Sequence, residues 1–298
     1  MRTYHQGSLA VQDRVGVRDL AEHVGQSIGP GIRPVAAAFL EAQPMLVLGA
    51  ADPVGRVWAG LLTGRPGFAR AVGPHTVSVV GGISAHDPLA GAVTAEGTPV
   101  GTIALDPRTR RRMRLNGTAH PSGRGFVIAA EQVFANCPKY LQKRELYGFA
   151  EDPGPRAGAV RHGTALTPGQ ERLVRTADTF FIATAAADGV DASHRGGNPG
   201  FVELVSPTEL TWPDYPGNAM FLTLGNLESD GRAGLLFLDW RTGTTLQLSG
   251  FAHAEFGPGG RTVRFRLDTV VEIPGASPLR WSAPEYSPAN PPLPKDRP

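Results

Sequence analysis

The chain has 298 residues, of which 41% are hydrophobic and 19% are charged, and its formal net charge is +2. This small charge gives no reason to expect nucleic acid, and no apolar stretch reaches the roughly 20 residues of a membrane span. The N-terminus lacks the apolar core of a signal peptide and the single Cys137 has no internal disulfide partner, so we expect a soluble, cytoplasmic protein. Two domains are expected, because single cores stop growing above roughly 250 residues.

Helices are expected at the start of the first half. Residues 10–28 carry a loose amphipathic stripe, and residues 34–43 lead directly into an apolar run. The segment MLVLGAADPVGRVWAG at 45–60 then predicts a strand, an Asp-containing turn and a second strand.

Further along the first half, basic residues gather in one short run. The alternation of this run with Met113 and Leu115 favours a strand with one solvated basic face. A phosphate-binding patch is the alternative. The run comprises Arg108, Arg110, Arg111, Arg112 and Arg114.

An internal repeat predicts the architecture. Residues 101–120 align with residues 234–253 without a gap, and each copy predicts a β-hairpin. The repeated glycines are expected to mark bulges or tight barrel corners. Residues 180–194 likewise repeat the strand, turn and strand of residues 45–60. The five identities of the hairpin are Gly101, Asp106, Gly117, Ala119 and His120, which recur as Gly234, Asp239, Gly250, Ala252 and His253.

The boundary between the two halves is expected at residues 151–161, where proline and glycine discourage both helix and central strand. A helix should follow, with Thr167 as its N-cap and Pro168 as its first residue. The predicted domains are therefore residues 1–150 and 162–281. The proline-rich tail at 282–298 is expected to be disordered or extended.

The segment DASHRGGNPGF at 191–201 carries the strongest chemical signal. A strand delivers Ser193, His194 and Arg195 into the glycine pair Gly196 and Gly197. Exposed backbone N–H groups beside a guanidinium suit an anion such as phosphate. From this segment alone, a flexible polar loop is an equally good interpretation.

The residues that follow carry a family resemblance. WPDYPGN at 212–218, an expected strand AMFLTLGN at 219–226 and GRAGLLFLDW at 231–240 occur in an order similar to that of the pyridoxamine 5′-phosphate oxidase-like FMN-binding split barrels. The likeness covers most of residues 170–255. It implies a mainly β (α+β) fold of two tandem split β-barrels with a few flanking helices, and it implies FMN as cofactor.

The resemblance also implies roles for individual residues. His194 would donate to the phosphate or act as a proton donor, and is a weak catalytic candidate. Arg232 would contact FMN or form a surface ion pair. The phosphate would be held by Ser193, Arg195, Gly196 and Gly197, with Asn218, Thr223 and Asn226 bonding to phosphate, ribityl chain or ring edge.

The first half departs from this pattern, because WAGLLTG at 58–64 contains no cation. Its phosphate loop is expected to be degenerate, which leaves one site. The segment CPKYLQKR at 137–144 resembles the part of related barrels that reaches across the barrel interface, whereas a short exposed basic helix is the alternative. Cys137 itself is expected to be a buried, inert thiol. The resemblance places Lys139, Tyr140, Gln142 and Arg144 against the phosphate loop.

These features predict an FMN-dependent oxidoreductase acting on a small-molecule substrate. Its redox partner would be a nicotinamide cofactor, oxygen or an electron-transfer protein, and a homodimer is one expected assembly because related barrels commonly dimerise. A flavin-storage module and a heme-binding split barrel that uses His120 or His253 remain alternatives. No metal is expected, since the motifs of zinc enzymes are absent, as are those of Rossmann dehydrogenases and nucleotide triphosphatases.

Overall fold

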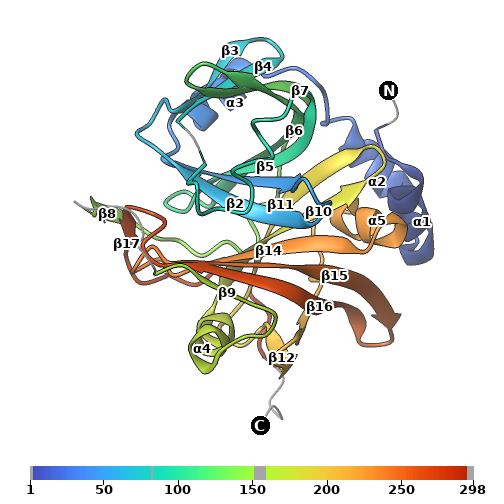
Figure 1. The fold of residues 1–298 in the computed structure, drawn as a ribbon. Coiled ribbons are helices and arrows are strands. Elements are labelled where there is room, and N and C mark those ends of the chain that lie inside the picture. Colours follow the sequence, from blue (N-terminus) through green and yellow to red (C-terminus); the bar gives the residue numbers. More distant parts are fainter. Residues whose placement is uncertain (1–2, 82, 151–158, 294–298) are drawn as a thin grey trace.

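The computed structural model describes residues 3–81, 83–150 and 159–293. Figure 1 shows two curled antiparallel sheets, the first in cyan and green and the second in yellow to red, with α1, α2 and α5 together at one side. The expected mainly β class, with open antiparallel sheets of the split-barrel type, is confirmed.

The two large sheets follow the same strand order. The first runs β2 (Val57–Thr63), β1 (Met45–Ala51), β5 (Thr98–Asp106), β6 (Arg111–Ser122), β7 (Gly125–Ala135), β4 (Thr76–Val80), β3 (Ala69–Gly73). The second runs β11 (Gly189–Gly196), β10 (Thr179–Ala186), β14 (Arg232–Leu238), β15 (Thr245–Gly257), β16 (Gly260–Ile273), β13 (Glu209–Pro213), β12 (Glu203–Ser206). β9 (Arg161–Gly163) pairs with β16, and β8 (Leu146–Phe149) pairs with β17 (Leu279–Trp281).

The repeated glycines serve two different purposes. Gly117 and Gly250 lie at register shifts of their ladders, so the expected bulges are confirmed there. Gly101 and Gly234 instead lie in unbroken ladders, which corrects the expectation of a bulge. A Cβ added at Gly101 would lie 2.6 Å from the backbone nitrogen of Ala192. These two glycines therefore let β5 approach β11, and β14 approach β2, across the contact between the sheets.

Each sheet encloses a core of its own, and a third cluster joins them. In the second sheet the Phe180 ring stacks on Phe201 and Phe237 at centroid distances of 5.8 and 5.2 Å, and Trp212 meets it edge-on. Such aromatic packing contributes beyond its buried area. The joining cluster contains Met45, Val47, Ile103, Phe181 and Leu236, all nearly fully buried. The two sheets therefore pack face to face through apolar side chains.

The helices differ from expectation in two places. The helix expected over residues 10–28 is two helices, α1 (Gln6–Val15) and α2 (Arg18–Gly25), because Gly16 ends the first in a left-handed conformation with φ 70°. α3 (Pro34–Glu41) and α4 (Pro168–Thr176) form as predicted, and Thr167 closes a capping box on α4.

The strand expected over residues 219–226 is wrong, because α5 (Leu222–Ser229) occupies most of this stretch. The helix is buried on nearly every side, between α1 and the second sheet. Its apolar residues therefore run without helical periodicity, and a short apolar run of this kind is easily mistaken for a strand. A Cβ added at Gly225 would lie 2.5 Å from Ser8, so this glycine allows α1 and α5 to touch.

The linker and tail are described in part. Of the expected linker at 151–161, residues 151–158 lie outside the described residues, as do residues 294–298 of the tail. Residues 282–293 run without helix or strand, and their contacts correct the expectation of disorder there: the Glu285 N–H donates to Lys143, and Asn290 bonds to Gln142 and Asn198. No helix among the described residues is long and apolar enough to span a membrane.

Candidate functional site

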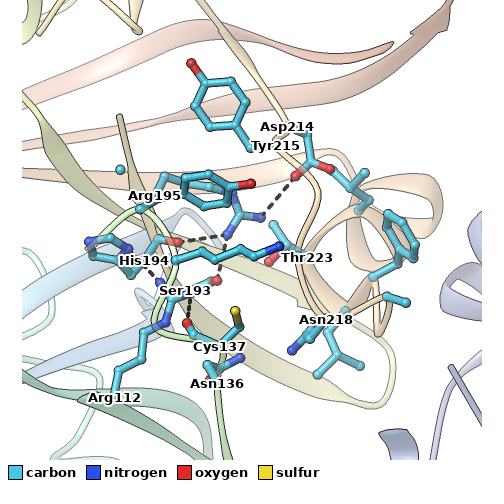
Figure 2. Close-up of a pocket in the computed structure, with 18 of the residues that line it drawn as sticks. Arg112, Asn136, Cys137, Ser193, His194, Arg195, Asp214, Tyr215, Asn218 and Thr223 are labelled. Carbon is cyan, nitrogen blue, oxygen red and sulfur yellow. Dashed lines mark hydrogen bonds and ion pairs between the residues drawn. The ribbon is translucent and has the colours of Figure 1, made fainter. Parts of the chain in front are cut away.

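A pocket lies where the two sheets meet, between β6 of the first and β11 of the second. The segment at 136–140 and the loop at 213–219 close its sides, and the N-terminal end of α5 faces it. Its cavity volume is about 100 Å³. Figure 2 shows Arg195 near the centre, with Arg112 and His194 on one side and Asn218 and Thr223 on the other. The pocket thus combines residues from both halves of the chain.

Two arginines of β6 point into this pocket. Alternate residues of a strand face one side, so Arg112 and Arg114 share a face. The Arg114 side chain is only 5% exposed and pairs with Asp191. Arg112 donates to His194 Nδ1 at 2.7 Å and to the Cys137 carbonyl at 2.8 Å. The expected solvated basic face is therefore wrong for these two residues, and the alternative of a phosphate-binding patch fits their placement.

Arg195 is held at the centre by its own strand. One terminal nitrogen donates to Ser193 Oγ at 2.7 Å and to the His194 carbonyl at 3.1 Å, and the other lies 3.7 Å from Asp214 (Figure 2). Asp214 also accepts from Arg261 at 2.8 Å. Because Asp214 is shared between two arginines, it neutralises Arg195 only in part.

The arginines perturb one another. Burial, and after it the charge of Arg195, lower the pKa of Arg112 to about 10. Burial and the charges of Arg195 and Arg112 hold the pKa of Arg114 well below its usual range. Burial, followed by the charges of Arg112, Arg195 and Arg144, also lowers the pKa of His194 well below its usual value. The site therefore carries uncompensated positive charge beside a neutral histidine.

Several buried polar atoms in the pocket have no hydrogen-bond partner among the described residues. They are Nε of Arg112, Arg114 and Arg195, Nε2 of His194 and Oδ1 of Asn136. Native proteins pair nearly all buried polar groups, so unpaired buried donors point to a ligand rich in acceptors. Since Nδ1 of His194 accepts from Arg112, its unpaired Nε2 carries the proton and is also a donor.

The backbone adds further donors. α5 begins at Leu222, its N-cap Phe221 makes no side-chain capping bond, and Leu222, Thr223 and Leu224 of its first turn line the pocket. First-turn amides have no partner within a helix, and they favour anions. Tyr140, Ala219 and Phe221 have φ values of 64°, 60° and 54° and all line the pocket. Strain of this kind gathers at functional sites.

The structure brings eight of the thirteen predicted site residues together. They lie on β11, on α5 and its preceding loop, and on the segment after β7. Tyr140 is fixed by a hydrogen bond from its hydroxyl to the Pro216 carbonyl. The eight are Lys139, Tyr140, Ser193, His194, Arg195, Gly196, Asn218 and Thr223.

Three other predicted residues support the pocket from outside. The Gly197 N–H donates to the Asp178 carbonyl at 3.1 Å. Gln142 is buried and donates to the Gly197 carbonyl at 3.2 Å, and Arg144 pairs with the Asp178 carboxylate at 2.7 Å. None of the three lines the cavity. The alternative of a basic helix at residues 137–144 is wrong, because this segment forms no helix.

The last two predicted residues lie elsewhere. Asn226 donates to Thr184 Oγ1 at 3.0 Å and lines a neighbouring cavity. Arg232 pairs with Asp230 and donates to the Gly55 carbonyl at 2.8 Å, which matches the surface ion pair rather than a cofactor contact. Sequence reasoning did not place Arg112 and Arg114 in the site. Their spacing of two on a strand was the only available signal.

Cys137 and the two repeated histidines were also singled out. Cys137 is partly exposed and lines the pocket, which corrects the expectation of full burial. The partly exposed His120 pairs with Glu96, and the exposed His253 pairs with Glu255. Among the described residues, no group of three or more His, Cys, Asp or Glu side chains could hold a metal ion. Neither histidine belongs to the pocket's lining.

A position equivalent to the pocket lies between β2 of the first sheet and β15 of the second. There Gly60 and Leu62 take the places of Ser193 and Arg195, and Gln247 takes that of Arg114. Gln247 donates to Ala59 O at 3.0 Å and to Asp87 at 3.1 Å. The Asp87 carboxyl lies 2.9 Å from where a Cβ at Gly60 would be. The two positions of Arg114 and Arg195 are therefore occupied by uncharged residues here.

No protein-family model matches the chain, and no curated protein matches its sequence. Among solved structures, it is similar to HupZ from Group A Streptococcus, with 14% identity, a TM-score of 0.28, and coverage of 35% of this chain and 90% of that one. It is also similar to the FAD binding protein from Mycobacterium smegmatis, with 9% identity, a TM-score of 0.27, and coverage of 38% of this chain and 99% of that one. A third similar structure is a putative pyridoxamine 5′-phosphate oxidase from Listeria innocua, with 10% identity, a TM-score of 0.25, and coverage of 33% of this chain and 91% of that one.

Proposed function

We propose that the chain is an FMN-binding oxidoreductase and that the pocket between β6 and β11 holds the FMN phosphate. The supporting observation is the charge of the site. Four cations line or rim the pocket, and their carboxylate partners among the described residues are Asp191 and Asp214, the latter shared with Arg261, which leaves an excess of at least two positive charges. A phosphate monoester carries about two negative charges at neutral pH, so it would neutralise this excess. The cations are Arg112, Arg114, Lys139 and Arg195.

The remaining part of FMN needs more room than this pocket offers. A volume of about 100 Å³ suits a phosphate, whereas whole-ligand pockets usually measure several hundred Å³. A second cavity of about 480 Å³ lies farther along β6 and β11, and Leu222 lines both. Its lining includes Asn116, Gln132, Asp191 and Asn226, and Asn116 Oδ1 is buried without a partner among the described residues. These acceptors fit the hydroxyl and imide N–H groups of a flavin.

When bound, the flavin would supply hydride or single-electron transfer, which protein side chains cannot perform. The chain's own residues would bind and orient it. Arg112, Arg114 and Arg195 would donate to the phosphate together with the first amides of α5. His194, whose pKa is lowered, would be a neutral donor through Nε2 at pH 7, so we assign it to binding rather than to acid catalysis.

The redox partner would be a nicotinamide cofactor, oxygen or a small electron-transfer protein. A flavin-storage module would bind the same cofactor at the same residues and differ only in lacking turnover. Reduction of the bound flavin by NADH or NADPH under anaerobic conditions separates the two functions. No observation favours heme, because His120 and His253 are both paired with carboxylates and neither lines the pocket.

The binding test is a titration with FMN, riboflavin and inorganic phosphate, after an absorption spectrum of the freshly purified protein. FMN should bind on the order of 100-fold more tightly than riboflavin, because several charge-assisted contacts to phosphate together contribute about 3 kcal/mol. Equal affinities would contradict the phosphate site. Phosphate binding without flavin binding would retain the anion site and refute FMN as its ligand.

A further inference from the structure

A second groove lies on the first sheet, on the other side of Arg112 from the phosphate pocket. It runs between α3 and the adjoining ends of β6 and β7, and its volume is about 290 Å³. The buried side chains of Met113, Val133 and Phe134 form its floor, and Phe39 of α3 forms one wall. Its accessible lining is mainly apolar. Val35 at its edge remains 62% exposed.

The rim of this groove is cationic. No carboxylate of the described residues lines it. Arg110 is already engaged with Glu285 at 3.0 Å, but Arg33 and Arg111 have no carboxylate partner in the described part of the chain. The Arg111 guanidinium lies 5.4 Å from the centroid of the Phe39 ring, which places a cation directly above an aromatic wall.

The backbone at the rim favours negative charge as well. α3 begins at Pro34, its N-cap Arg33 makes no capping hydrogen bond, and its first turn contains no acidic residue. Arg33, Val35 and Ala36 of this end line the groove. An uncapped helix N-terminus attracts an anion. Here it adds to two guanidinium groups without carboxylate partners in the described chain, around one apolar cavity.

We propose that this groove binds a small aromatic carboxylate. The ring would pack on Phe39 and on the apolar floor, and the carboxylate would be held by Arg33, Arg111 and the backbone N–H of Val35. A volume of about 290 Å³ suits one or two fused rings. The apolar lining disfavours a free phosphate or a sugar, whereas the uncompensated arginines disfavour a neutral hydrocarbon. The proposal is independent of FMN, since only Arg112 and Asn136 line both cavities.

The test is a titration of the full chain with 2-naphthoate, by calorimetry or by the fluorescence of the acid. Arg33→Gln combined with Arg111→Gln should weaken binding about 10-fold, because each exposed ion pair to the carboxylate contributes roughly half of the corresponding binding free energy. The neutral analogue 2-naphthamide should bind the unaltered chain about 10-fold more weakly than the acid. Arg70→Gln, an exposed arginine on β3, is the matched control and should bind naphthoate as the unaltered chain does.

Two further variants locate the bound acid within the molecule. Val35→Asp alters only an exposed helix residue, so it should fold normally and weaken naphthoate by adding a negative charge at the rim. Arg195→Ala should leave naphthoate binding unchanged. The proposal is overturned if the double variant binds naphthoate normally, if the amide binds as tightly as the acid, or if Arg195→Ala abolishes binding. The last outcome would place the acid in the phosphate pocket.

Discussion

Replacing Arg195 by alanine tests the phosphate site most directly. The Arg195 side chain is 19% exposed, and its guanidinium is held toward the pocket by Ser193 Oγ at 2.7 Å. Removing it takes away one of the four cations and a pair of charge-assisted donors. A loss of about 2 kcal/mol is expected, which corresponds to a roughly 30-fold weaker FMN affinity.

The same change should spare the ligand-free protein. Asp214 keeps Arg261 at 2.8 Å, so no carboxylate is left without a cation. Arg112 and Arg114, whose pKa values are lowered first by burial and then by the charge of Arg195, meanwhile lose that repulsion. We therefore expect the melting temperature of the ligand-free protein to be unchanged or higher, while the stabilisation that FMN provides becomes smaller.

The assay is a fluorescence titration with FMN and riboflavin, paired with thermal unfolding in the presence and absence of each. Riboflavin, which lacks the phosphate, should bind Arg195→Ala and the unaltered chain equally. Arg232→Ala is the matched control, because this arginine pairs with Asp230 away from the pocket. The reasoning fails if Arg195→Ala binds FMN normally, or if riboflavin is weakened as much as FMN.

Three further predictions concern stability. Gly101→Ala should lower the free energy of unfolding, measured with urea, by at least ~2 kcal/mol, because its Cβ would lie 2.6 Å from the backbone of β11. The control Gly148→Ala, whose Cβ meets open space, should leave this free energy unchanged. Burial raises the pKa of Asp87 from 3.8 to about 6, so the stability tied to its protonated form is present below pH 4 and lost as pH rises through 6. Asp87→Asn should therefore stabilise the chain by about 3 kcal/mol at pH 8 and by little at pH 4, and equal effects at both pH values would contradict this. Arg144→Ala should lower the free energy of unfolding by ~3–5 kcal/mol, because it leaves the buried Asp178 carboxylate without its cation. The folded variant should keep its FMN affinity in the same titration. A weaker FMN affinity would show that Arg144 belongs to the binding site.

The fold was predictable because its signals are local and occur twice. A hairpin repeated at constant spacing reports one architecture in two copies, and the shared strand order of the two sheets agrees with it. Thr167 and Pro168 likewise predict a helix, because capping depends only on residues that are close in the sequence. α5 escaped prediction because its burial comes from α1, more than two hundred residues earlier in the chain, and no local pattern records that contact.

The site was predictable only along β11. The sequence signal there is the glycine pair that follows Ser193, His194 and Arg195, and the structure places all three residues in the pocket. Arg112 and Arg114 reach the same pocket from β6, about eighty residues away, through packing of one sheet on the other. Arg232 illustrates the converse: of the two roles predicted for this residue, the structure shows the ion pair, with Asp230 two residues before it.

The two equivalent positions between the sheets argue that the cationic pocket is kept for a ligand. At the position between β2 and β15, Gln247 stands in place of Arg114 and donates to Asp87, so a neutral amide there faces a single buried acid. Between β6 and β11 the same fold instead buries arginines that repel one another and leaves their donors unpaired among the described residues. Since Gln247 occupies this position in the same architecture, the fold does not by itself require an arginine there. The burial of several like charges together at only one of the two positions is explained by an anion that binds there.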